Sequence, residues 1–240
     1  MSSIDTQEIH NFSKDATDWW DENGPFKPLH RLNPVRLSYI KEQICEAFDK
    51  DVSNLKALKG LSILDVGCGG GLVCEPLARL CAIVTGVDAD PIAIETAQKH
   101  AKASELEIDY QNKPAEDMQK QFDIVLALEI IEHVQNPAEF VETISKLVKP
   151  GGLVIFSTLN RNPKSFLLGI VAAEYILRWV PQGTHSWKKF IRPSELAKMA
   201  RACGLQTNDV TGLIFNPLNN EFKLSKNDLD VNYLLSCKKD

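Results

Sequence analysis

The chain has 240 residues, of which 44% are hydrophobic and 25% charged, and its formal net charge is -5 at pH 7. This length and apolar content suit a single globular domain over residues 1–240, and the negative charge argues against a nucleic-acid partner. The six cysteines form no C-x-x-C pair and the N-terminus is polar, so zinc-ribbon sites, thioredoxin-like sites and a secretory signal are not expected, whereas reduced thiols in the cytoplasm are.

Two helices are predicted ahead of the first strand, forming a helical cap over about residues 1–58. Residues 5–22 carry apolar side chains at helical spacing, which predicts the first helix. Residues 22–32 contain two prolines and a glycine and read as a loop. Asn33 is typical of a helix N-cap and Pro34 of the first helical position, so the second helix is expected from there to about Phe48.

Strands and helices alternate from Gly60 onward, and this order predicts a parallel sheet covered by helices on both faces. Strands are expected near 62–67, 82–88, 106–110, 122–128 and 152–158, and helices near 71–80, 90–103 and 137–148. An apolar segment at 164–180, a helix near 193–203 and two strands at about 205–214 and 231–237 follow. The expected fold is therefore a doubly wound, Rossmann-like α/β sheet of seven strands.

A glycine-rich turn directly follows the first predicted strand. Gly67 and Gly69 begin this turn, and the segment after it has helical character, so backbone N–H groups and a positive helix end are presented to a ligand. Asp88 closes the next strand about twenty residues later, where an acidic side chain binds ribose hydroxyls. With Asp88 in register, a turn that merely connects two elements is disfavoured, and a nucleotide-type pocket is predicted.

The residues around this turn favour S-adenosylmethionine over a nicotinamide dinucleotide. The fingerprint G-x-G-x-x-G lacks its third glycine, because Leu72 stands at that position. Asp65 lies inside the strand, where its carboxylate can accept from an ammonium group but would repel a pyrophosphate. An NAD-dependent oxidoreductase is the alternative that these two residues disfavour.

A second cluster, Glu129, Glu132 and His133, follows the strand at 122–128 and should face the ligand-binding edge of the sheet. If this turn is helical, the three side chains converge and could hold a divalent cation. Mg²⁺ is favoured over softer ions if water molecules complete its coordination shell. His133 could instead act alone as a general base, or the acidic residues could simply suit a helix N-terminus. Either a metal or a base would activate a phenol, which is mostly protonated at neutral pH.

Three further stretches extend the pattern over nearly the whole chain: Trp19 to Arg36, Ser157 to Asn162, and Ala172 to Ser194. Together with the glycine turn and the second cluster, they closely resemble the ubiquinone-biosynthesis O-methyltransferases, which methylate a polyprenyl catechol and demethylubiquinol with S-adenosylmethionine.

The resemblance implies a role for each matching residue. Arg36 would contact the methionine carboxylate of the donor. The backbone at Gly67 would approach the donor, Asp88 would bind its ribose, and Leu128 would border it at the strand end. The E-x-x-E-H motif of the family, proposed there as the metal site, is intact in Glu129, Glu132 and His133.

The insertion at about 162–192 is expected to form a helical lid over the substrate. Its apolar part is interrupted by Glu174 and Arg178 and is shorter than the roughly 20 apolar residues of a spanning helix. Basic flanks and a tryptophan suit a membrane interface, while a lid packed only on its own domain is the alternative. Since the implied substrate carries a polyprenyl tail, we expect reversible contact with lipids at the inner face of the membrane.

Two expectations about partners follow. Other enzymes of ubiquinone biosynthesis are candidate partners of this chain. A non-catalytic, cofactor-binding subunit of a lipid-associated assembly is the remaining alternative, and the intact cluster from Glu129 to His133 disfavours it because a scaffold has no need for such a group.

Overall fold

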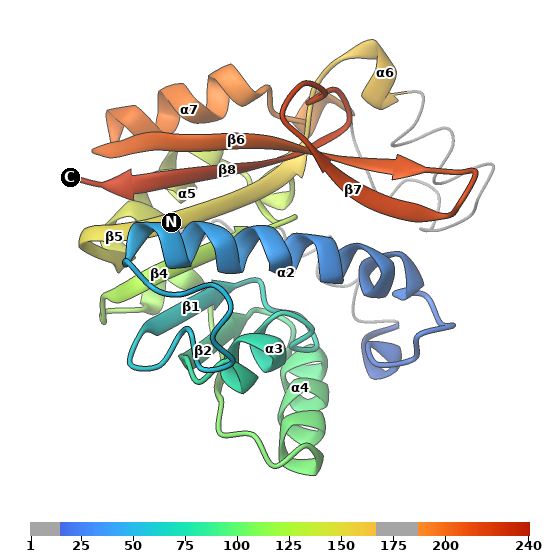
Figure 1. Ribbon diagram of the computed structural model, residues 1–240, viewed down its shortest axis with the longest axis vertical. Coiled ribbons are helices and arrows are strands. Elements are labelled where there is room, and N and C mark those ends of the chain that lie inside the picture. Colours follow the sequence, from blue (N-terminus) through green and yellow to red (C-terminus); the bar gives the residue numbers. More distant parts are fainter. Residues whose placement is uncertain (1–14, 167–186) are drawn as a thin grey trace.

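A single mixed sheet organises the computed structural model, which describes residues 15–166 and 187–240 (Figure 1). Its strand order is β3-β2-β1-β4-β5-β8-β6-β7. The strands are β1 (Ser62–Val66), β2 (Ile83–Asp88), β3 (Asp109–Asn112), β4 (Phe122–Leu128), β5 (Val148–Leu159), β6 (Leu205–Asn216), β7 (Glu221–Ser225) and β8 (Asn232–Lys239). The helices of more than one turn are α2 (Lys27–Ala47), α3 (Cys74–Arg79), α4 (Pro91–Ala103), α5 (Pro137–Leu147) and α7 (Pro193–Ala202).

The first five strands are parallel and the last three are antiparallel to their neighbours. The chain first builds the sheet outward from β1 to β3 and then returns to add β4 on the other side of β1. In such doubly wound sheets, ligands bind beyond the carboxyl ends of the strands where the order reverses. Val66 is in register with Ala127, so the turn after β1 and the turn after β4 are neighbours at this edge.

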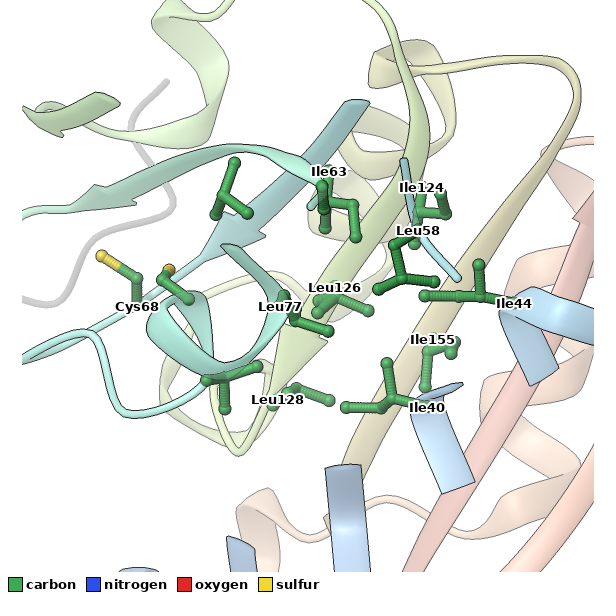
Figure 2. Packing of buried hydrophobic residues seen from close by; sticks show 14 of the residues in the cluster. Ile40, Ile44, Leu58, Ile63, Cys68, Leu77, Ile124, Leu126, Leu128 and Ile155 are labelled. Carbon is green, nitrogen blue, oxygen red and sulfur yellow. The ribbon is translucent and has the colours of Figure 1, made fainter. Parts of the chain in front are cut away.

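Helices cover both faces of the sheet. Successive side chains of a strand point to opposite faces, so the apolar strands contribute to one hydrophobic core on each side. Ile63 and Ile124 belong to a core shared with α2, α3 and α4, and Figure 2 shows this cluster around Ile40 and Ile44 of α2. Leu64 belongs to the second core, which is shared with α5 and α7. The predicted doubly wound α/β architecture is confirmed.

The start of the chain differs from the prediction. Helix α2 begins at Lys27, so only the first part of the predicted loop at 22–32 is a loop, and Asn33 is not an N-cap. Pro34 is inside α2, and the Asn33 side chain donates to the carbonyl of Leu72 instead of capping. Of the helix predicted at 5–22, residues 1–14 lie outside the described part, and the rest contains only a 3₁₀ turn at Ala16–Asp18.

The sheet has eight strands in the described part of the chain, so the predicted number of seven is wrong. The additional strand, β7, forms the sheet edge and pairs only with β6 among the described strands. It is five residues long, and Phe222 packs on Phe215 of β6 with ring centroids 5.1 Å apart. Such a short edge strand contributes little apolar periodicity of its own, because hairpin pairing rather than burial defines it.

Most of the predicted lid at 162–192 lies outside the described residues. Its described ends are the single turns α6 (Pro163–Ser165) and η5 (Trp187–Lys189). No helix within 15–166 or 187–240 has both the length and the apolar character to cross a membrane.

Candidate functional site

The glycine turn after β1 has a backbone shape that side chains oppose. Gly67 and Gly69 have φ values of +73° and +52°, in the left-handed region that favours glycine. A Cβ at Gly67 would lie 2.4 Å from Cδ1 of Ile130, which belongs to the turn after β4. The two turns therefore pack directly on each other, and Ile130 approaches the backbone at Gly67 this closely only because Gly67 carries no side chain.

Asp88, predicted to bind ribose, holds the glycine turn in place. Its Oδ2 accepts from the backbone N–H of Gly69 at 2.8 Å, and its Oδ1 accepts from that of Asp90 at 2.8 Å. Burial raises the pKa of Asp88, whereas these backbone hydrogen bonds oppose the rise. Each carboxylate oxygen can accept more than one hydrogen bond, so Asp88 retains acceptor capacity for a pair of hydroxyls.

Asp65 and Arg36 are both almost fully buried, at 3% and 4% exposure. Burial raises the pKa of Asp65 to about 6, against the opposing hydrogen bond from Cys74 and the charge of Arg36. Burial also lowers the pKa of Arg36, and the charges of Glu129 and Asp65 counteract this. Arg36 is oriented by Asn33, whose Oδ1 accepts from Nη2 at 2.8 Å.

One guanidinium thus lies in the field of two carboxylates. An added ammonium beside Asp65 would favour the ionised form of that buried carboxyl. The carboxylate of the same ligand would find its partner in Arg36. The arrangement suits a free amino-acid end, and the roles predicted for Asp65 and Arg36 stay predictions.

Glu129 is held from two strands that are distant in sequence. Its φ is +52°, which is rare for a residue with a side chain and means that the turn is not helical at this point. The N–H of Glu129 donates to the carbonyl of Ser157, and the Ser157 hydroxyl donates back to Oε1 at 2.7 Å. Asn232 donates through Nδ2 to both oxygens, at 3.0 and 3.1 Å.

Glu132 is a buried carboxyl whose proton equilibrium lies near neutrality. Burial and the charge of Glu129 raise its pKa to about 7, while His133 and Thr158 favour its ionised form. Its Oε2 accepts from the hydroxyl of Thr158 at 2.8 Å, but its buried Oε1 has no hydrogen-bond partner. An unpaired buried acceptor at the ligand-binding edge has capacity for one further hydrogen bond without the loss of an existing one.

Glu129, Glu132 and His133 therefore lie within electrostatic reach of one another. Their side chains do not converge as a helical turn would have them do, because the backbone at Glu129 is left-handed and its carboxylate turns to β5 and β8. Over the ranges that the structure describes, no three His, Cys, Asp or Glu side chains are grouped so as to hold a metal ion.

Leu128 ends β4 at 7% exposure and packs in the same buried cluster as Leu126 and Leu77 (Figure 2). It lies directly before Glu129, between the core and the ligand-binding edge. Its predicted contact with the donor stays a prediction.

Sequence reasoning did not single out Ser157, Thr158 and Asn232. Ser157 and Thr158 could have been found as two polar residues at the end of a strand that is otherwise apolar. Asn232 carried no local signal, because only the antiparallel pairing of β8 with β5 brings it opposite Leu159. The sequence predicts Asn33 as a helix cap, whereas in the structure it lies inside α2 and its side chain accepts from Arg36.

Comparisons with known proteins agree on one family. Residues 37–210 match the model of a methyltransferase domain. The chain is 50% identical to the ubiquinone biosynthesis O-methyltransferase of Cereibacter sphaeroides, over 97% of this chain and 96% of that one. It is 48% identical to the protein of the same name from Rhizobium etli, over 99% and 97% of the two chains.

Solved structures support the fold. The magnesium protoporphyrin IX methyltransferase of Synechocystis PCC 6803, solved with bound S-adenosylmethionine, covers 100% of both chains with a TM-score of 0.66 at 15% identity. A possible histamine N-methyltransferase from Thermotoga maritima covers 97% of this chain and 100% of its own, with a TM-score of 0.64 at 18% identity.

Proposed function

Because the chain belongs to the family of the ubiquinone biosynthesis O-methyltransferases, we propose that it transfers the methyl group of S-adenosylmethionine to a phenolic hydroxyl of a polyprenyl-substituted ring. The substrates proposed are the catechol and demethylubiquinol intermediates of ubiquinone synthesis. The observation that carries the proposal is Glu132, a buried carboxyl with an unpaired oxygen and a pKa of about 7, at the edge where the donor is expected.

The donor is bound along the glycine turn in this proposal. The backbone at Gly67 and Gly69 lies against it, and Asp88 accepts from its ribose hydroxyls. Arg36 pairs with the carboxylate of its amino-acid end and Asp65 with the ammonium. Support for the last pairing comes from Asp65 itself, a buried carboxyl whose pKa burial raises to about 6 and whose ionised form a bound ammonium would favour.

Methyl transfer is an in-line displacement at carbon. The phenolate oxygen forms a bond to the methyl carbon, the carbon–sulfur bond breaks, and its electron pair converts the sulfonium to a neutral thioether. The phenol must first lose its proton, and we assign Oε1 of Glu132 as the acceptor. A positioned base typically contributes on the order of 10²–10⁴-fold. His133 is assigned the role of favouring ionised Glu132, since its charge lowers the pKa of that carboxyl.

The proposal also includes a divalent cation held by Glu129, Glu132 and His133. The residues fit such an ion only in part: the unpaired Oε1 of Glu132 suits a cation, whereas both oxygens of Glu129 accept from Asn232. Glu129 would have to exchange these partners before three ligands could converge. When bound, a cation would stabilise the phenolate and orient two neighbouring oxygens of a catechol.

We also propose that the chain meets the membrane surface reversibly through residues 165–187, at the inner face, where its substrate resides. Support comes from the apolar sequence of this segment and the basic residues around it. The described flank contributes Phe166, whose side chain is 47% exposed. Deleting 165–187 should abolish co-sedimentation with liposomes, and undiminished binding of the deletion variant would refute this point.

The proposed function is tested by calorimetric titration followed by a turnover assay. S-adenosylmethionine should bind and NADH should not; the reverse result would restore the oxidoreductase alternative. A short-chain catechol analogue should then be methylated, and an absence of product would favour the non-catalytic alternative. The same assay after dialysis against a chelator, with and without Mg²⁺ added back, decides whether a cation takes part.

A further inference from the structure

The tandem tryptophans Trp19 and Trp20 connect the N-terminal segment to the glycine turn. A Cβ placed on Gly69 or Gly70 would lie 2.4 or 2.3 Å from atoms of Trp19, so that side chain packs directly on the turn. The indole Nε1 of Trp20 donates to the carbonyl of Gly70 at 2.9 Å. These contacts lie on the turn itself, apart from Glu129 and Glu132, to which we assign the chemistry.

Trp20 is held in turn by His100 of α4. The two rings are stacked, with centroids 3.5 Å apart and planes inclined by 3°. Nδ1 of His100 lies 2.6 Å from Oε1 of Glu75, in α3 directly after the turn. Indole, imidazole and carboxylate thus form a continuous chain that ends on the Gly70 carbonyl.

Glu75 is only 2% exposed, and a buried carboxylate is costly unless it is paired. Its partners are His100 and, at 3.5 Å, Nη2 of Arg79. An apolar residue at this position of a short helix would avoid that cost. Through its contact with His100, Glu75 is placed to orient the imidazole that stacks on Trp20.

The glycine turn that Trp20 contacts loses much conformational entropy when it is held in one shape. Gly67, Gly69 and Gly71 all have positive φ, and glycine loses more backbone freedom on ordering than any other residue. Side-chain hydrogen bonds to the turn come from three directions: Asp88 from β2, Asn33 from α2, and Trp20 from the N-terminal segment. The first two belong to elements that already contribute to the donor site, and the third does not.

We propose that Trp20, His100 and Glu75 are positioning residues that keep the glycine turn in its donor-binding shape and thereby set the affinity for S-adenosylmethionine. The inference rests on the proposed identity of the donor. Its sign follows from population arithmetic: when only a fraction of molecules holds the competent shape, the apparent Kd rises by the inverse of that fraction. Losing one of the three side-chain hydrogen bonds that reach the turn from other elements lowers this fraction.

Two variants separate this role from a contribution to stability alone. Trp20→Phe keeps a ring against His100 and removes the Nε1 donor, so the Kd for S-adenosylmethionine should rise by up to about fivefold, the full effect of losing one hydrogen bond. Glu75→Gln keeps a side chain of the same shape without the charge that orients His100, and the Kd should rise about two- to threefold. In both variants, kcat at saturating donor and KM for the phenol should stay at wild-type values.

Glu95→Gln is the matched control, because Glu95 lies on α4, as His100 does, and pairs like Glu75 with a basic side chain, here Lys99, but at the exposed surface. Its donor Kd should not change. A Kd within 1.5-fold of wild type in both Trp20→Phe and Glu75→Gln would overturn the inference, whether or not thermal stability falls, and tighter donor binding would overturn it as well. If wild-type protein does not bind the donor at all, it is the proposed function that fails.

Discussion

Replacing Asp65 by Asn should make the protein more stable and a poorer binder of its donor. The folded protein protonates Asp65 at a pKa of about 6, against an ordinary value of 3.8, because burial disfavours the charge. Between these two values the folded state keeps a proton that the unfolded state releases, so stability falls as the pH rises through this window. Above pH 6, ionised Asp65 lowers the free energy of unfolding by roughly 3 kcal/mol, at 1.36 kcal/mol for each unit of difference between the two pKa values.

Asp65→Asn removes this cost, so its free energy of unfolding at pH 8 should exceed that of wild type by up to about 3 kcal/mol. This gain in stability should shrink below pH 6 and vanish near pH 4, where Asp65 of the wild type is protonated and therefore uncharged, as asparagine is. Donor binding should weaken by about 10- to 150-fold, the loss of one charge-assisted hydrogen bond worth roughly 1.5–3 kcal/mol. Urea unfolding at both pH values and calorimetric titration of the donor measure the two effects.

Asp123→Asn is the control, because this aspartate is in the neighbouring strand β4 and its partners outweigh the effect of its partial burial. It pairs with Lys149 at 2.8 Å and accepts from Ser62, and these contacts lower its pKa. Its replacement should destabilise the protein and leave the donor Kd unchanged. If Asp65→Asn proves less stable than wild type at pH 8, or binds the donor with wild-type affinity, the role assigned to the buried carboxylate is wrong.

Three further predictions concern the same site. In wild-type protein, donor affinity should fall as the pH drops below about 6, approaching tenfold per pH unit, because Asp65 must release its proton to receive the ammonium; a flat calorimetric profile from pH 5 to 8 would contradict this. Glu132→Gln should lower kcat on a short-chain catechol by about 10²–10⁴-fold with the donor Kd unchanged, and steady-state turnover near the wild-type rate would remove Glu132 as the base. Gly67→Ala should fold less stably and bind donor far more weakly, because its methyl group would lie 2.4 Å from Ile130 in a backbone conformation with positive φ; an unchanged melting temperature and donor Kd would show that the two turns do not pack as described.

The parts of the site that the sequence revealed are those whose geometry is local. Asp65, Gly67 and Gly69 are within five residues of one another, and a strand followed by a glycine turn has few ways to fold. Asp88 ends the next strand, and parallel pairing of β1 with β2 brings it to the same edge. For these residues, spacing along the chain determined position in space.

The parts that the sequence missed depend on contacts between distant segments. Glu129 was expected to continue into a helical turn, but hydrogen bonds from Ser157 and Asn232 hold it in a left-handed conformation that no local pattern encodes. The start of α2 was placed at Asn33 by its capping preference, whereas the partners of that side chain, Leu72 and Arg36, are tertiary and intrahelical. Propensity is a weak guide wherever tertiary hydrogen bonds compete with it.

The central claim is that one carbon passes from a sulfonium donor to an aromatic hydroxyl at the edge formed by β1 and β4. Its most direct test is a single-turnover reaction of the full chain with S-adenosylmethionine labelled in its methyl group and a short-chain catechol. Mass spectrometry should find the label in a methoxy group of the product, in an amount equal to the S-adenosylhomocysteine formed. Label that stays on the donor, or that appears on protein or ring carbon instead of oxygen, would contradict the account.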